Sequence, residues 1–160
     1  MRIGHGFDAH RLVPNRSLVL GGVNIDYERG LSGHSDADVL THAVMDALLG
    51  AAALGDIGLH FPDSDERWRG ARSLELLGVV GRLVAEAGFC VSNIDATLAA
   101  QAPRMSPHRE QMRRNIAAAL GLTADRVNVK FTTEEKMGYT GLGEGMKAHA
   151  VCLLEEVKEG

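Results

Sequence analysis

Histidine and aspartate gather near the start of the chain, where the first 65 residues hold 5 of the 7 His and 8 of the 10 Asp. Aspartate favours caps and turns, but histidine has no turn preference, so the histidines need another explanation. Asp8 and His10 lie two residues apart in an expected strand, which places them on the same face. Together with His42 they offer two nitrogens and one oxygen, and a catalytic zinc typically has three protein ligands. The alternative is a surface pair and a solvated helix residue, and spacing alone does not decide between the two.

The helix expected to carry His42 would begin close to His34 and Ser35. A helix N-terminus offers free backbone N–H groups and a partial positive charge, which suit a phosphate. Ser35 is a plausible cap for this helix, whereas His34 has no capping role and is a candidate for substrate contact. Asp38 and Asp46 lie one turn to either side of His42 and would form a polar stripe opposite the apolar face.

Two further segments have residue types that suit a phosphorylated substrate. Residues 55–66 form a loop rich in glycine and carboxylates, which could equally be a plain surface turn. Residues 132–135 end an expected strand, where Thr132 and Thr133 could bind phosphate oxygens and a nearby carboxylate could hold Mg²⁺ or Mn²⁺. The glycines at 141, 143 and 145 match neither a Walker A loop nor a dinucleotide fingerprint.

The elements that must position these residues can be placed from hydrophobic periodicity. We expect strands at 2–12, 18–25, 90–101, 127–133 and 146–157, with the second strand paired to the first, and helices at 36–54, 70–87 and 107–120. This order predicts an α/β sandwich with a mixed four-stranded sheet, a small hairpin and helices on one face. In the first strand Ile3, His5 and Phe7 face away from Asp8 and His10, so His5 is expected to be structural, and His149 is expected to be a packed core residue.

Length and composition limit the function classes. A chain of 160 residues suits a single domain over residues 1–160, and a net charge of −4 is a poor fit to general nucleic-acid binding. The sequence has no apolar run of about 18 residues and no signal-peptide core, so we expect a cytoplasmic protein without a membrane span. Cys90 and Cys152 are 62 positions apart and match no zinc or redox motif.

Taken together, these residues resemble the 2-C-methyl-D-erythritol 2,4-cyclodiphosphate synthase family of the non-mevalonate isoprenoid (MEP) pathway. The resemblance runs through blocks in the family's order along nearly the whole chain: RIGHGFDAHRL (2–12), SGHSDADVLTHAVMDALLGAAALGDIG (32–58), FPDSD (61–65), AQAPRM (100–105) and TTEEKMGYTG (132–141). It implies a homotrimer with active sites between subunits, a substrate linked to cytidine diphosphate, one Zn²⁺ per subunit and a second divalent ion, Mg²⁺ or Mn²⁺, that enters with substrate.

The resemblance also assigns roles to individual residues. It implies that Asp8, His10 and His42 bind zinc, that Glu135 holds the second ion, and that His34 and Thr133 stabilise developing charge as catalytic residues. The implied substrate contacts are Asp8, Ala9, His10, His34, Ser35, Asp46, Asp56, Ile57, Gly58, Phe61, Pro62, Asp63, Ser64, Asp65, Ala100, Gln101, Ala102, Pro103, Arg104, Met105, Ser106, Thr132, Thr133, Glu134, Glu135 and Tyr139.

Four positions depart from the family pattern. Tyr139 replaces a common Phe, Arg104 a common Lys, and Glu134 a frequent Thr. Leu142 stands where many members have an Arg beside the trimer axis. Our hypothesis is that this protein would not retain a prenyl diphosphate there.

Two other functions fit the same residues. A metal-dependent phosphohydrolase could use the Asp/His set to activate water, and it would release inorganic phosphate or an open diphosphate. A non-catalytic trimeric metal-binding scaffold is the other alternative, but it would have no use for the loop at 55–65.

Overall fold

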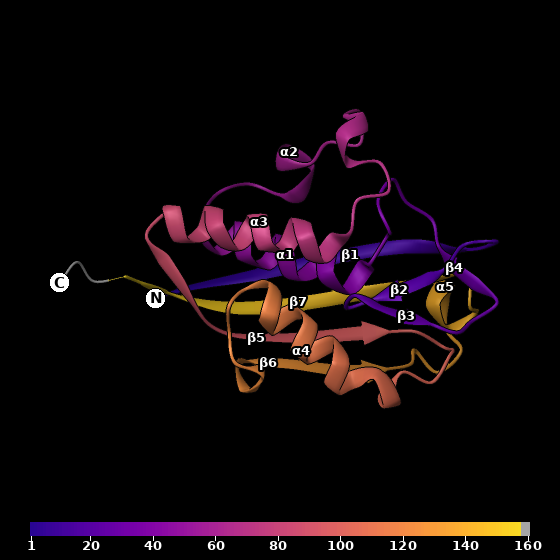
Figure 1. Cartoon of the computed structure of the whole chain (residues 1–160). Coiled ribbons are helices and arrows are strands. Elements are labelled where there is room, and N and C mark those ends of the chain that lie inside the picture. Colours follow the sequence, from indigo (N-terminus) through magenta and orange to yellow (C-terminus); the bar gives the residue numbers. More distant parts are fainter. Residues whose placement is uncertain (158–160) are drawn as a thin grey trace.

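The structure is a computed structural model that describes residues 1–157. Its helices and strands are arranged in layers (Figure 1). The strands are β1 (Arg2–Pro14), β2 (Leu18–Leu20), β3 (Val23–Ile25), β4 (Arg29–Leu31), β5 (Phe89–Ala99), β6 (Val127–Thr132) and β7 (Gly145–Glu156). The α-helices are α1 (Val39–Ala51), α2 (Ile57–His60), α3 (Ser73–Glu86), α4 (Arg109–Ala119) and α5 (Gly138–Gly141), with short 3₁₀ turns at Glu66–Trp68, Ser106–His108 and Ala124–Arg126.

The main sheet is mixed, as the sequence predicts, but it has five strands in the order β4-β1-β7-β5-β6 rather than four. The additional strand, β4, lies between the expected strand at 18–25 and the expected helix at 36–54. Strand β7 is antiparallel to both β1 and β5, and β6 is parallel to β5. Strands β1, β5 and β6 therefore run in the same direction, and their C-terminal ends meet at one edge of the sheet.

The expected strand at 18–25 was wrong in two respects. Two short strands, β2 and β3, replace it, and they pair with each other in a separate sheet instead of pairing with β1. The turn between them is Gly21-Gly22, with φ values of 53° and 69°. Two positive φ values in a two-residue turn are the geometry that joins hairpin strands most readily, and glycine adopts it without strain.

Helices α1, α3 and α4 cover one face of the main sheet, as expected (Figure 1). Alternate residues of β7 on this face are buried among them: Met146, Ala148, Ala150, Cys152 and Leu154. Helix α1 packs directly on the backbone of β1, because Gly4 and Gly6 leave no side chain between them. This close approach places the first turn of α1, which carries His42, beside the middle of β1, which carries Asp8.

The opposite face of the sheet is uncovered within the described chain and carries apolar side chains. Ile3 is 74% exposed, Phe7 48% and Val151 44%. The expectation that His149 is a core residue was wrong, since it lies on this face and its Nδ1 is 3.2 Å from Nε2 of His5. In residues 1–157 we find no helix with both the length and the apolar character needed to cross a membrane.

Helix α1 begins at Val39 with Asp38 as its N-cap, so the expected start at residue 36 and the Ser35 cap were wrong. Asp38 is fully buried, and its carboxylate accepts hydrogen bonds from the backbone N–H groups of Gly21, Gly22 and Thr41 and from the Thr41 hydroxyl. One side chain thus caps α1 and fastens the β2–β3 hairpin to it. The helix ends at Ala51, before the expected end at residue 54.

Candidate active site

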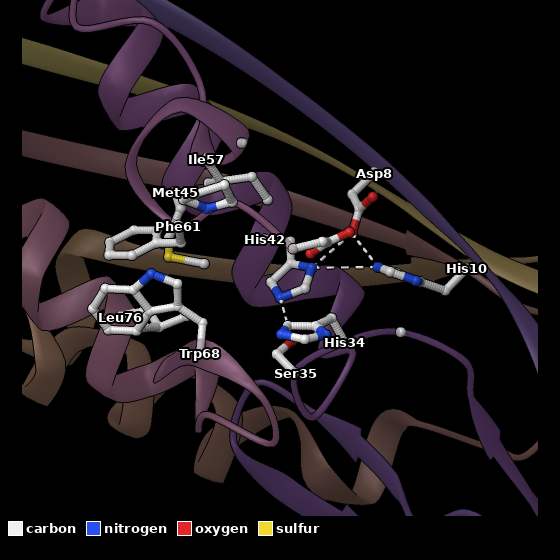
Figure 2. Close-up of a pocket in the computed structure, with 14 residues that line it drawn as sticks. Asp8, His10, His34, Ser35, His42, Met45, Ile57, Phe61, Trp68 and Leu76 are labelled. Atoms are coloured by element: carbon white, nitrogen blue, oxygen red, sulfur yellow. Dashed lines mark hydrogen bonds and ion pairs between the residues drawn. The ribbon is translucent and has the colours of Figure 1, made fainter. Parts of the chain in front are cut away.

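The structure brings Asp8, His10 and His42 together at the junction of β1 and α1 (Figure 2). The three facing atoms are Oδ2 of Asp8, Nε2 of His10 and Nδ1 of His42. The Asp8–His10 distance is 2.8 Å, the Asp8–His42 distance 3.0 Å and the His10–His42 distance 3.3 Å. In the described part of the chain this is the one group of His, Cys, Asp and Glu side chains with the spacing of a metal site.

These distances fit a tetrahedral metal ion. Ligands about 2.0–2.1 Å from a zinc ion are separated from one another by roughly 3.3 Å, so a small expansion of the triangle would admit the ion. On the outer side of His10, Nδ1 lies 2.7 Å from the carbonyl oxygen of Ser32. A carbonyl only accepts, so Nδ1 carries the proton and the Nε2 lone pair of the neutral ring is left to face Asp8 and His42.

The ionisation of Asp8 is consistent with a site for positive charge. Burial would raise the pKa of Asp8, but the adjacent imidazoles of His10 and His42 outweigh burial and hold that pKa well below its usual value. For His10, burial favours the neutral ring, yet the Asp8 carboxylate prevails and raises the pKa of His10. Without a cation, a proton is therefore drawn to the position that a metal ion would occupy.

His42 is only 8% exposed, so the alternative of a solvated helix residue was wrong. Its ring lies between β1 and the segment before α1, and its outer nitrogen Nε2 is 3.2 Å from the hydroxyl of Ser35 and 2.9 Å from that of Ser73. Asp46 does not contact His42 by hydrogen bond. Its Oδ1 instead accepts from the backbone N–H of Ile57, at 2.8 Å, which positions the start of α2. Burial raises the pKa of Asp46.

A cavity of about 360 Å³ opens beside the three candidate ligands. Its polar wall contains His34, Ser35 and Asp63, and its apolar wall contains Met45, Ile57, Gly58, Phe61, Pro62, Trp68 and Leu76 (Figure 2). The buried Nε2 of His34 has no hydrogen-bond partner among the described residues. An unpaired polar atom in a cavity wall is available to a ligand.

The loop at 55–65 contributes to the cavity through only some of the expected residues. Ile57, Gly58, Phe61, Pro62 and Asp63 line it, while Asp56, Ser64 and Asp65 do not. Asp56 caps α2, and Asp65 caps the following 3₁₀ turn and pairs with Arg67. Trp68 was not singled out from the sequence. Its ring packs edge-on against Phe61 with the centroids 5.2 Å apart, and its buried indole N–H has no partner in the described chain.

A second cavity, of about 460 Å³, lies where β5 and β6 end. It is lined by all the implied substrate contacts between positions 100 and 106, namely Ala100, Gln101, Ala102, Pro103, Arg104, Met105 and Ser106, and also by Arg109, Phe131, Thr132 and Thr133. Arg109 and Phe131 were not singled out from the sequence.

The strand-end residues beside that cavity are held by local hydrogen bonds. The Thr133 hydroxyl donates to Oε1 of Glu135 at 3.1 Å, whereas Glu134 accepts from Thr140 and pairs with Lys147. Tyr139 and Ala9 line a smaller pocket of about 190 Å³ with His10. Leu142 is exposed.

Comparison with known proteins gives this arrangement its context. The family model described as YgbB family matches residues 1–155. The chain belongs to the YgbB family. Curated relatives named 2-C-methyl-D-erythritol 2,4-cyclodiphosphate synthase include one from Clostridium perfringens, 60% identical over 96% of this chain and 99% of its own, and one from Burkholderia thailandensis, 61% identical over 96% and 94%. The family resemblance is confirmed, and as a YgbB protein with these synthase relatives the chain is an enzyme.

Solved structures agree with the YgbB assignment. A 2C-methyl-D-erythritol-2,4-cyclodiphosphate synthase described as its CDP-bound form has a TM-score of 0.88 and 40% identity, with 96% of this chain and all of that chain covered. A CDP complex of IspF from Plasmodium falciparum has a TM-score of 0.86 and 31% identity, over 98% and 97% of the two chains. The bifunctional IspDF of Campylobacter jejuni has a TM-score of 0.94 and 44% identity. The match covers 98% of the present chain and 42% of that longer chain.

Proposed function

We propose that this YgbB protein converts 4-diphosphocytidyl-2-C-methyl-D-erythritol 2-phosphate to 2-C-methyl-D-erythritol 2,4-cyclodiphosphate and CMP, as a phosphorus–oxygen lyase of isoprenoid precursor biosynthesis. An oxygen of the 2-phosphate forms a bond to the β-phosphorus. The bond from that phosphorus to the bridging oxygen breaks, and its electron pair leaves with CMP. The observation that carries the proposal is the convergence of three metal-ligand atoms beside a cavity in a chain about 60% identical to enzymes of that name.

The metal centre proposed for this reaction is a zinc site made by Asp8, His10 and His42. A bound divalent ion there would neutralise charge on the diphosphate as a Lewis acid. Three protein ligands leave one position of a tetrahedral ion free for a substrate oxygen. Two nitrogens and one oxygen, with one imidazole buried and the others half-buried, favour zinc over magnesium, which prefers oxygen ligands.

The surrounding side chains would bind and orient the substrate. The apolar wall formed by Ile57, Phe61 and Leu76 suits the methyl-substituted carbon chain, and the second cavity, at Ala100–Ser106, suits the cytidine. His34 and Thr133 are placed to donate hydrogen bonds to phosphate oxygens as charge develops. Holding the 2-phosphate in line with the β-phosphorus can contribute about 7–11 kcal/mol to the acceleration. Glu135, next to Thr133, is the proposed ligand of a second Mg²⁺ or Mn²⁺ ion.

A homotrimer would complete the site, because within one chain the Thr132–Glu135 segment lies apart from the candidate metal ligands. Ala9, Lys147, Ala99 and Thr132 lie in one row across β1, β7, β5 and β6. Three strand spacings place Thr132 about 14 Å from Ala9 along this row. The side chain of Thr132 also points to the uncovered face, whereas Asp8 and His10 point toward α1. Packing copies through the uncovered face would bury Ile3, Phe7 and Val151 and could bring the Thr132–Glu135 segment of one copy to the metal site of the next.

Phosphorus NMR of the product tests the proposed reaction. We expect two mutually coupled diphosphate signals, equimolar release of CMP and no inorganic phosphate. Inorganic phosphate or an open diphosphate would instead identify a phosphohydrolase. Asp8→Ala and His42→Ala should abolish turnover and reduce the metal content per subunit, while sedimentation still shows a trimer. Unchanged turnover in both variants would remove the proposed role of the metal.

A further inference from the structure

The outer nitrogen of the candidate ligand His42 faces a buried hydroxyl that has a carboxylate behind it. Nε2 of His42 is 2.9 Å from Oγ of Ser73, the first residue of α3. The same Oγ donates a hydrogen bond to Oδ1 of Asp36, and the other oxygen of Asp36, Oδ2, accepts the backbone N–H of Ser73 at 3.0 Å. Ser73 is completely buried and Asp36 is half-buried, so water does not reach the Ser73 hydroxyl.

The protons in this chain of hydrogen bonds can be assigned from what each group is able to donate. A carboxylate only accepts, so the single hydroxyl proton of Ser73 is used toward Asp36. The Ser73 oxygen can then only accept from His42, which requires the proton of the neutral imidazole to be on Nε2. The lone pair of His42 is therefore on Nδ1, the atom that lies 3.0 Å from Asp8 and 3.3 Å from His10.

We propose that Ser73 and Asp36 are positioning residues for the metal, which fix the tautomer and the orientation of His42 so that Nδ1 is presented to the ion. This inference rests on the proposed metal site and extends it to two residues that contact neither the ion nor the cavity. Ligating histidines commonly donate their other N–H to an acceptor, and loss of that acceptor typically lowers metal affinity 10–100-fold.

Asp36 is well suited to hold this arrangement because its own position is fixed. Its carboxylate also accepts from the backbone N–H of Asp38, at 3.3 Å, and its backbone N–H donates to the carbonyl of Ala71 at 3.1 Å. Asp36 thus joins the segment before α1 to the start of α3. Helix α3 lacks a side-chain cap from its own N-cap residue, Arg72. One of the free N–H groups at its N-terminus, that of Ser73, is satisfied because it donates to Asp36.

The primary test measures the affinity of the apo protein for Zn²⁺ by competition with a chromophoric chelator. Ser73→Ala should bind Zn²⁺ 10–100-fold more weakly than the wild type. The matched control is Ser35→Ala, which removes a hydroxyl 3.2 Å from the same nitrogen but with no carboxylate behind it, and it should have a clearly smaller effect. Ser92→Ala, near the start of β5, should bind like the wild type.

Two further measurements separate positioning from a general loss of structure. Asp36→Asn has a single side-chain acceptor for the three N–H and O–H donors around it, so the Ser73 proton can turn toward His42 and favour the wrong tautomer. It should also lose at least 10-fold in Zn²⁺ affinity, whereas Ser73→Thr, which keeps the hydroxyl, should retain most of the affinity. Unfolding in the presence of a chelator gives the stability of each variant independently of metal.

Nitrogen-15 NMR of the imidazoles in the zinc-loaded wild type provides a test that depends on no variant. It should show His42 protonated at Nε2 and bound through Nδ1. Protonation at Nδ1, Ser73→Ala affinity within twofold of the wild type, or equal losses in Ser73→Ala and Ser35→Ala would overturn the inference. A wild-type protein that binds no Zn²⁺ would instead refute the proposed metal site itself, so the two failures are distinguishable.

Discussion

The substitution Gly6→Ala tests whether the spacing between β1 and α1 sets the metal geometry. A Cβ at Gly6 would lie 1.9 Å from the carbonyl oxygen of Ala43 and 2.6 Å from the backbone nitrogen of Ala47. These are backbone atoms of α1 and cannot rotate away. Because Gly6 is two residues before Asp8, and Ala43 directly follows His42, a forced separation acts on two of the three candidate ligands at once.

The size of the effect follows from that contact. Ordinary van der Waals contact begins at about 3.4 Å, so α1 must move by about 1.5 Å relative to β1. Overpacking of this kind costs about 1–3 kcal/mol of stability. Metal sites tolerate deviations of only about 0.2 Å in ligand distance, and a misplacement of about 1 Å can cost 100-fold in rate. We therefore expect a folded but less stable protein with roughly 100-fold lower turnover and much weaker Zn²⁺ binding.

The assay compares urea unfolding, Zn²⁺ affinity and CMP release in Gly6→Ala and in Gly50→Ala. Gly50 lies in the same helix and is exposed, and a Cβ added there would meet no atom within 4 Å. Gly50→Ala should be more stable than the wild type by about 0.5–1 kcal/mol, with unchanged metal binding. A folded Gly6→Ala protein with wild-type Zn²⁺ affinity and turnover would refute the reasoning.

Three other outcomes follow from the structure. Asp38→Asn should lower the free energy of unfolding by about 1–3 kcal/mol in urea titrations, because an NH₂ group replaces one of the two oxygens that accept four hydrogen bonds. A loss below about 0.5 kcal/mol would contradict this account. Burial raises the pKa of the Cys152 thiol to about 11. In the folded protein the exposed Cys90 should therefore react with a thiol reagent first, and Cys152 should react only on unfolding. Equal reaction rates would argue against the packing of β7. Burial opposes ionisation of Asp95, but bonds from Lys130 and Asn128 prevail and lower its pKa, so its contribution to stability is present above the unfolded pKa of about 3.9 and is lost as the pH falls through the lower folded value. Both members of that ion pair are substantially exposed, so the contribution is below about 1 kcal/mol, and the stability difference between wild type and Asp95→Asn should shrink between pH 7 and pH 3 rather than grow.

The sequence predicted the parts of the site that depend on local periodicity. Asp8 and His10 share a face because strand side chains alternate. The residues at 100–106 were indicated by the family resemblance and not by periodicity. The meeting of His42 with that pair could not be derived from spacing alone. It depends on the close contact of α1 with Gly4 and Gly6, which is a property of the packed structure.

The errors also have physical causes. Strand β4 has only three residues, Arg29–Leu31, too few for an alternating pattern to be visible. Ser35 has the right residue type for a cap, but Asp38 is the N-cap of α1, because its carboxylate also accepts hydrogen bonds from the N–H groups of the hairpin turn at Gly21-Gly22. Ser73 is distant from Asp36 and His42 in the sequence, and its importance becomes apparent only when α3 is placed beside α1.

The parallel run of β1, β5 and β6 also determines where a protein fused to Met1 would lie. Arg2 pairs with Leu154, so β1 starts where β7 ends, at the end of the sheet away from the candidate metal ligands and the second cavity (Figure 1). An affinity tag or a fluorescent protein joined to Met1 would therefore project from the end remote from both cavities. When the enzyme is immobilised on a surface through this end, both cavities should stay accessible and turnover should be unchanged.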